Sequence, residues 1–186
     1  MLFIIGQSTT LGRRAGLAAV LGIATGIFVH TCLVSLGLAA LLVESKTAFD
    51  MIQYAGAAYL VYLGAKSILS KDHPLLLKIK AGKKSTYSFS KCYFQGLMVN
   101  LLNPKVILFF LAFLPQFVDE TSSMSIALQL FILGFVFNVV GSTLDGLIGY
   151  FFSFAKNWLE THPQAFVWQQ RVMGVFFIGI AVHLVL

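Results

Sequence analysis

Long apolar runs separated by short polar stretches dominate the chain. Ala15–Val43 contains no acidic residue, lysine or arginine. Met51–Ser70, Cys92–Val118, Ser125–Phe154 and Phe166–Leu186 contain a single charged residue each. Each run reaches the roughly 20 residues that an α-helix needs to cross a bilayer. The pattern therefore predicts an all-α integral membrane protein.

Met1–Leu11 is also apolar but shorter than the other runs. At about 1.5 Å per residue it crosses only about half of a bilayer core, so we interpret it as a partial first span. Counting it gives six spans in one transmembrane domain, 1–186, with a truncated first span. Six spans divide into two sets of three, and sets with an odd number of spans cross in opposite senses. We therefore predict a bundle of two inverted three-helix halves.

Composition and charge narrow the class of protein. Hydrophobic residues make up 58% of the chain and charged residues only 11%, with a mean hydropathy of +0.86. These values exclude an ordinary soluble domain. The net charge of +6 could indicate nucleic acid, but with alternating spans the basic residues collect on one side. That side receives Arg13, Arg14, Lys66, Lys71, Lys78, Lys80, Lys83, Lys84, Lys91, Lys156 and Arg171, against Lys46 on the other.

This asymmetry satisfies the positive-inside rule with both termini outside. The basic loop 71–91 is then cytoplasmic and needs no nucleic acid, although contact with lipid headgroups remains open. Trp158, between the last two spans, is interpreted as an interfacial anchor.

Lys105 is the first candidate for chemistry inside the membrane. It lies about 13 residues into its span, or roughly 20 Å from the inner end, too far to reach a surface easily. Pro104 lacks a backbone donor and Asn103 can cap a helix that restarts there. A broken helix with a lysine at its new N-terminus is suited to a substrate carboxylate. The structural alternative is a proline kink with Lys105 paired internally.

Asp145 is the only acidic residue inside a span. Asn138, Gly141 or Ser142, Asp145 and Gly149 recur at helical spacing as a stripe of small and polar residues, which should face the interior or a cavity. Asp145 could bind a substrate ammonium, carry a coupling proton, or only neutralise Lys105.

His30 is a further candidate for proton coupling. It shares a helix face with Ala19, Gly22 and Gly26, and such a face is typical of close helix packing, which is the structural alternative. Cys32 and Cys92 fit neither a disulfide framework nor a metal motif. With no metal-ligand cluster, phosphate loop or nucleophile motif in the sequence, we predict no enzyme activity, cofactor or metal.

Several segments together resemble the lysine exporter (LysE) family, particularly its homoserine and threonine efflux (RhtB) branch. They are Gly12–Gly16, Tyr54–Leu60, Tyr62–Gly64, Phe94–Leu97, Asn100–Lys105 and Phe113–Phe117. The resemblance implies a multi-pass inner-membrane exporter of amino acids, driven by the proton gradient, with an acid in the fifth span that matches Asp145. The family's Pro-Gly-Pro element of the first span would precede Met1.

From this resemblance we expect a bacterial efflux permease for small amino acids such as threonine, homoserine or lysine, working by proton antiport. Substrate binding is assigned to Asn100, Asn103, Pro104, Lys105 and Asn138, and proton coupling or ammonium binding to Asp145 and His30. The expected partners are an amino acid, a proton and membrane lipids, and a homodimer through small-residue faces stays open. The alternatives are a non-transporting membrane fragment or assembly subunit and, third, an intramembrane enzyme.

Overall fold

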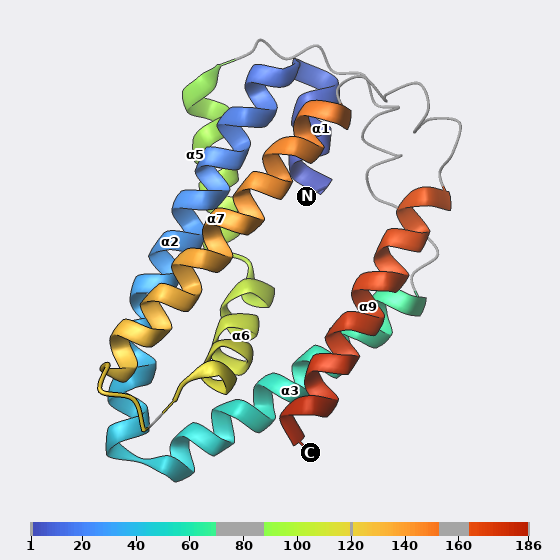
Figure 1. Cartoon of the computed structure of the whole chain (residues 1–186). Helices are drawn as coiled ribbons and strands as arrows, with labels where there is room; N and C mark the ends of the chain where they lie inside the picture. The colour runs from blue at the N-terminus through green and yellow to red at the C-terminus, as the bar shows by residue number, and fades with distance from the viewer. Residues whose placement is uncertain (1, 70–87, 120, 153–163, 186) are drawn as a thin grey trace. The chain divides into compact units, whose positions relative to one another are not determined.

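In the computed structural model of the chain, residues 2–69, 88–119, 121–152 and 164–185 are described (Figure 1). Within these ranges every regular element is helical, which confirms the all-α prediction. The elements are α1 (Leu2–Leu11), α2 (Arg13–Glu44), α3 (Lys46–Leu69), α5 (Phe89–Leu101), α6 (Pro104–Phe113), the 3₁₀ helix η1 (Leu114–Phe117), α7 (Ile126–Phe152) and α9 (Gln164–Val185).

The helices follow the predicted apolar runs but extend into the polar residues that flank them. The clearest case is α3, which begins at Lys46 rather than Met51. Ser45 explains the early start, because its hydroxyl accepts a hydrogen bond of 3.2 Å from the backbone amide of Ala48 and so caps the first turn. Most of the predicted basic loop 71–91, together with Lys156 and Trp158, lies outside the described residues.

Among the described helices, two are long and apolar enough to cross a membrane alone: Arg13–Ala40 within α2 and Ile126–Phe151 within α7. The bent pair formed by α5 and α6–η1 makes a third if it counts as one span. Gln170–His183 within α9 is a shorter apolar helix. Length and composition of the described helices therefore support two or three of the six predicted spans.

The exposed surface of α7 is strongly apolar. Such a row of side chains is unfavourable in water and suits lipid. It comprises Leu128, Ile132, Phe135, Val136, Val139, Val140, Leu144, Leu147 and Phe151.

The chain forms two compact units, each assembled from segments that are distant in sequence. Unit 1 comprises 1–26, 71–102 and 138–168, and unit 2 comprises 27–70, 103–137 and 169–186. Neither unit coincides with a three-helix half of the sequence. The inverted relation between the halves stays a prediction.

Unit 1 is organised by a close approach between α2 and α5. A Cβ at Gly22 would collide with the backbone carbonyl of Tyr93, and a Cβ at Gly96 would collide with that of Ala19. Beside this contact, the Tyr93 hydroxyl donates a 3.0 Å hydrogen bond to Thr25 Oγ1. The prediction that the glycine face of α2 packs closely against another helix is confirmed here.

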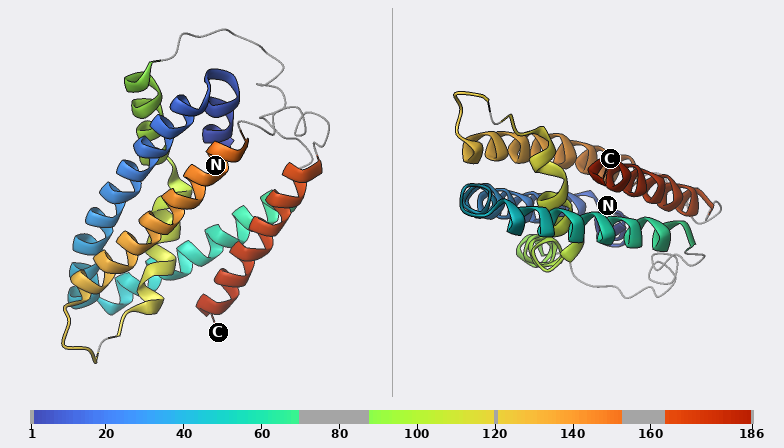
Figure 2. Two further views of the ribbon diagram at one scale, coloured as in Figure 1. Left: turned by 45° about the horizontal axis from the view of Figure 1, so that its top comes forward. Right: turned by 90° about the horizontal axis from the view of Figure 1, so that it is seen from below.

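The directions of the helices in unit 1 agree with successive spans that cross the membrane in opposite directions. The start of α2 packs against the start of α5, where Ala15, Ala18 and Cys92 form a buried apolar cluster. At the same end, the Arg13 guanidinium lies 4.9 Å from the ring centroid of Tyr150, near the end of α7. Thus α2 and α5 run in parallel and α7 runs antiparallel to them (Figures 1 and 2).

Unit 2 is organised by α3, which contacts both α6 and α9. A Cβ at Gly56 would lie 2.7 Å from the Ala112 Cβ on α6, and a Cβ at Gly64 would lie 2.7 Å from the carbonyl oxygen of Gly174 on α9. A Cβ at Gly174 would in turn lie 2.7 Å from the side chain of Ile68. Small residues again permit backbone approach, and α3 and α9 run antiparallel, as Figure 2 shows.

Candidate functional site

The predicted helix break is present between α5 and α6. The amide of Leu102 still donates to the carbonyl of Met98 at 3.0 Å, which closes the last turn of α5. Asn103 then adopts an extended conformation, with φ −89° and ψ 102°. The two helical parts are bent by 53°. Residues before proline favour extended backbone, so the Asn-Pro pair explains where the helix breaks.

Asn103 caps the restarted helix, as predicted. Its side-chain Oδ1 accepts a 3.1 Å hydrogen bond from the backbone amide of Lys105, and its carbonyl accepts one of 3.1 Å from Val106. Pro104 occupies the first helical position, where its missing N–H leaves no unmet bond. The N-terminus of α6, which carries the positive end of the helix dipole, is therefore well defined, and Lys105 lies in its first turn.

The Lys105 side chain is half-buried and contacts an aromatic ring. Its Nζ lies 4.0 Å from the ring centroid of Phe177, which is on α9 and only 4% exposed. A cation at this distance over a ring face is attracted by the ring quadrupole. Sequence reasoning missed Phe177, because a phenylalanine in an apolar run carries no signal that distinguishes it from ordinary packing.

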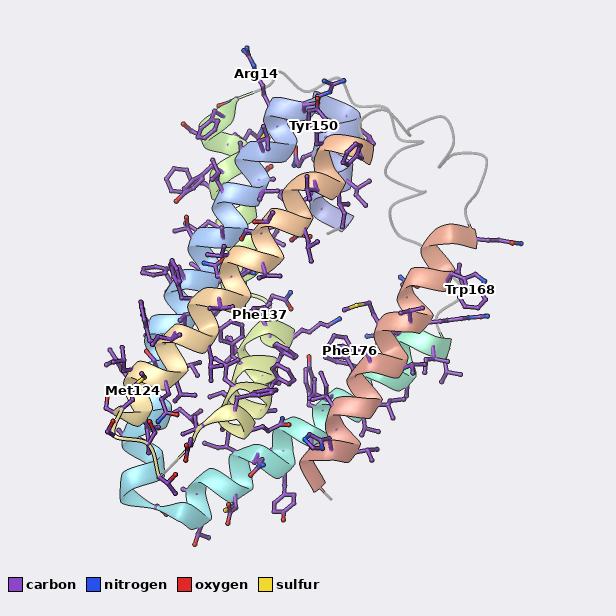
Figure 3. The ribbon with its side chains drawn as sticks, in the orientation of Figure 1. Arg14, Met124, Phe137, Tyr150, Trp168 and Phe176 are labelled. Atoms are coloured by element: carbon purple, nitrogen blue, oxygen red, sulfur yellow. The ribbon has the colours of Figure 1, made fainter. Side chains whose placement is uncertain are left out.

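Aromatic side chains of α6 pack against one another and against a ring of α7. The Phe137 ring of α7, labelled in Figure 3, lies 5.3 Å from the Phe109 ring and 5.5 Å from the Phe110 ring, measured between centroids. Phe113 stacks on Phe109 at 4.8 Å. This apolar cluster fixes the orientation of α6 and therefore of its N-terminus.

The polar stripe on α7 faces other helices in unit 1. The amide nitrogen of Asn138 donates a 3.0 Å hydrogen bond to the carbonyl of Ala24 on α2, and Ser142 Oγ donates to Asn138 Oδ1 at 3.0 Å. At the other end, a Cβ at Gly149 would lie 2.8 Å from the Ile4 side chain of α1. These contacts confirm the predicted inward orientation at both ends, and Asp145 between them is half-buried.

Asn100 lies in the last turn of α5 and is 6% exposed. Its side chain is against α2, where a Cβ at Gly26 would lie 2.7 Å from Asn100 Oδ1. His30 is in the part of α2 that belongs to unit 2 and is 4% exposed. Next to it, Thr31 packs against Gly134 of α7, so His30 lies in a closely packed region.

The candidate residues fall into both units. Asn103, Pro104, Lys105 and His30 belong to unit 2, and Asn100, Asn138 and Asp145 belong to unit 1. The structure directly joins Asn103 to Lys105 through the cap. Neutralisation of Lys105 by Asp145, one of the roles that the sequence leaves open, stays a hypothesis.

The sequence analysis did not predict a polar contact between α1 and α5. The Gln7 side chain on α1 donates a 3.2 Å hydrogen bond to Gln95 Oε1 on α5, and Cys92 Sγ donates to Gln7 Oε1 at 3.7 Å. The only sequence signal for this contact was the presence of one of these glutamines in each of two apolar runs. Their contact ties the short α1 to α5 within unit 1, where Cys92 is also buried against Ala15 and Ala18.

The described residues contain no group of three or more His, Cys, Asp or Glu side chains that could hold a metal ion. The chemistry that they offer is electrostatic: a helix N-terminus with an adjacent ammonium in unit 2, and a half-buried carboxylate in unit 1.

Comparison with known proteins identifies the family. The sequence matches the LysE type translocator family over residues 1–186. The chain belongs to this family. The resemblance noted from the sequence is therefore confirmed at the level of the family, whereas its RhtB branch stays a prediction.

Similar proteins cover most of this LysE-family chain. An uncharacterized membrane protein of Bacillus subtilis, YrhP, is 30% identical over 97% of this chain and 87% of its own length. A leucine efflux protein of Salmonella choleraesuis is 28% identical, over 98% of this chain and 84% of its own. An uncharacterized membrane protein of Vibrio cholerae is 35% identical over 63% of this chain and 55% of its own. No solved structure matches the chain.

Proposed function

We propose that this protein is a multi-pass permease of the bacterial inner membrane that exports small amino acids in exchange for protons. Membership of a translocator family and similarity to a leucine efflux protein support export of an amino acid. The observation that carries the proposal is the broken helix with Lys105 at its capped N-terminus. Broken helices are how many secondary transporters present backbone dipoles to a substrate in the membrane.

In this proposal Lys105 and the N-terminus of α6 receive the substrate carboxylate. The ammonium and the helix dipole are both positive, and a half-buried position strengthens their attraction for an anion because little water screens it. Asn103 contributes by fixing the first turn of α6. Asn100 and Asn138 belong to unit 1, and their part in substrate binding stays a hypothesis from the sequence.

We assign the coupling proton to Asp145. It is the only acidic residue within the predicted spans, and ionisable residues inside membranes are functional candidates by default. His30 is retained as a second proton-coupling candidate. Its closely packed position favours a structural role instead.

The first experiment is an export assay. Bacteria that express this chain are loaded with dipeptides, and the full amino-acid panel, including leucine, threonine, homoserine and lysine, is followed in the medium. We expect selective export that Lys105→Ala abolishes at equal membrane abundance. Lys66→Ala is the matched control, because Lys66 is also a span lysine over an aromatic ring, 5.7 Å from the Tyr62 centroid, but is exposed.

Export that survives Lys105→Ala would overturn the assignment of Lys105. An abundant wild-type chain that exports no amino acid would instead favour the alternative function, a non-transporting membrane subunit. The contact between Lys105 and Phe177 supports that alternative, because it gives the lysine an internal partner without any substrate.

A further inference from the structure

In unit 2 the side chain of Lys105 on α6 contacts the ring of Phe177 on α9. The ammonium lies over the ring face, 4.0 Å from the centroid, and the ring is 4% exposed. Three residues before Phe177, Gly174 contacts α3: a Cβ added at Gly174 would lie 2.7 Å from the carbonyl oxygen of Gly64. Gly174 and Phe177 are one helical turn apart, so the ring lies on the face of α9 that packs against α3.

We propose that Phe177 is a positioning residue that holds the Lys105 ammonium beside the N-terminus of α6, charged and available to a substrate carboxylate. This inference rests on the proposed function, in which Lys105 receives that carboxylate. Phe177 acts through Lys105 and need not touch the substrate.

An aromatic partner suits this role better than a carboxylate partner would. An aspartate or glutamate would neutralise the lysine and compete with the substrate for the same N–H donors. A ring face attracts the cation through its quadrupole but carries no net charge, so the positive charge stays available. The ring also offers no strong acceptor that would occupy all three N–H groups of the ammonium.

The contact also restricts a flexible side chain. Lysine carries much rotamer entropy, which is lost when its ammonium is fixed on a substrate. Holding the ammonium over Phe177 beforehand reduces that loss at the moment of binding. Weakening the contact should therefore weaken substrate binding and leave the rate of the transport cycle at saturation nearly unchanged.

The test replaces Phe177 with phenylalanine carrying one, two and three ring fluorines, which weaken the quadrupole while nearly preserving the shape of the ring. The substrate is the amino acid that the wild-type chain exports. We expect KM to rise stepwise, by about 2- to 30-fold in total. We expect kcat to change by less than about twofold.

The same series at Phe176 is the matched control. Phe176 is the neighbouring residue on α9, labelled in Figure 3, and is 53% exposed. Fluorination there should leave KM unchanged. A purely structural role for the Phe177 ring predicts that KM is equally insensitive to fluorination there. That result would overturn the inference.

A second readout does not depend on transport. In the purified protein with ¹³C-labelled lysine, the ε-methylene signal of Lys105 should be shifted upfield by the ring current, and Phe177→Leu should remove the shift. Absence of the shift in the wild type overturns the inference. Export that depends on Lys105 but not on ring fluorination overturns this inference alone, whereas export that ignores Lys105→Ala overturns the proposed function and this inference with it.

Discussion

Lys105 shows how neighbouring residues determine the role of one side chain. A lysine in an apolar span must be paired, hydrated or neutral, and the structure gives its ammonium an aromatic face and the start of a helix. Asn103 contributes through a single side-chain hydrogen bond to the Lys105 backbone. At the residue scale, the candidate site of unit 2 is thus a capped helix start with an adjacent cation.

The cap can be tested directly. Asn103→Ala removes the acceptor for the Lys105 amide and should lower the free energy of unfolding by about 0.5–2 kcal/mol. The measurement is the thermal unfolding midpoint of the purified protein in detergent. Asn103→Asp is the control, because its carboxylate keeps the acceptor and should retain most of the stability. Equal losses in both variants would contradict the cap.

Asp145 gives a prediction about energy coupling. Asp145→Asn cannot take up or release a proton, so export by this variant should no longer depend on the proton gradient. The measurement is amino-acid efflux at several external pH values, with and without an uncoupler. Asp145→Glu, which keeps a carboxylate, is the control and should retain the dependence. A normal pH dependence in Asp145→Asn would exclude Asp145 as the proton carrier.

At the scale of elements, glycines decide where helices meet. Gly22 and Gly96 let the backbones of α2 and α5 approach in unit 1, and Gly56 and Gly64 do the same for α3 in unit 2. Within a membrane, helix association depends on such close packing rather than on burial from water. The glycine spacing in the sequence predicted the face of α2 that contains Gly22, but it did not say which helix would cover it.

Two glycines on α2 form a matched pair for a test. Gly22→Ala places a methyl group against the Tyr93 backbone and should destabilise the protein by about 1–3 kcal/mol. Gly37→Ala meets no atom within 4 Å of the added Cβ, so helix propensity alone acts, and stability should stay equal or rise by up to about 1 kcal/mol. Thermal unfolding of both variants checks this, and a Gly22→Ala protein as stable as Gly37→Ala would contradict the close contact.

At the scale of the whole molecule, each unit contains segments from both halves of the sequence. In unit 1, α2 and α5 run parallel and α7 antiparallel, and in unit 2, α3 and α9 run antiparallel. Six alternating spans predict all of these directions. The side of the membrane on which each end lies follows only from the distribution of basic residues.

Membrane orientation therefore gives the last prediction. The excess of lysine and arginine on one side predicts that the C-terminus lies outside the cytoplasm. Alkaline phosphatase fused after Leu186 should be active and green fluorescent protein at the same position should be dark. The same two fusions within the basic loop, after Lys84, should give the opposite result. A fluorescent C-terminal fusion would contradict the predicted orientation.

The sequence by itself determined the helical class, the approximate helix ranges, the break at Asn103–Pro104 and the polar stripe of α7. These features are local: they depend on apolar run length, on backbone restriction beside proline and on side-chain spacing along one helix. The early start of α3 was missed, because a serine cap can extend a helix through charged residues outside the apolar run.

Only the tertiary structure decided which side chains meet across helices. Phe177 became the partner of Lys105, Asn138 bonded to Ala24, and Gln7 bonded to Gln95. Each pair joins residues far apart in the chain, and their approach is set by small residues and aromatic packing at several contacts at once. No pattern along a single helix encodes that choice, because many phenylalanines and glycines in this chain are equivalent until the helices pack.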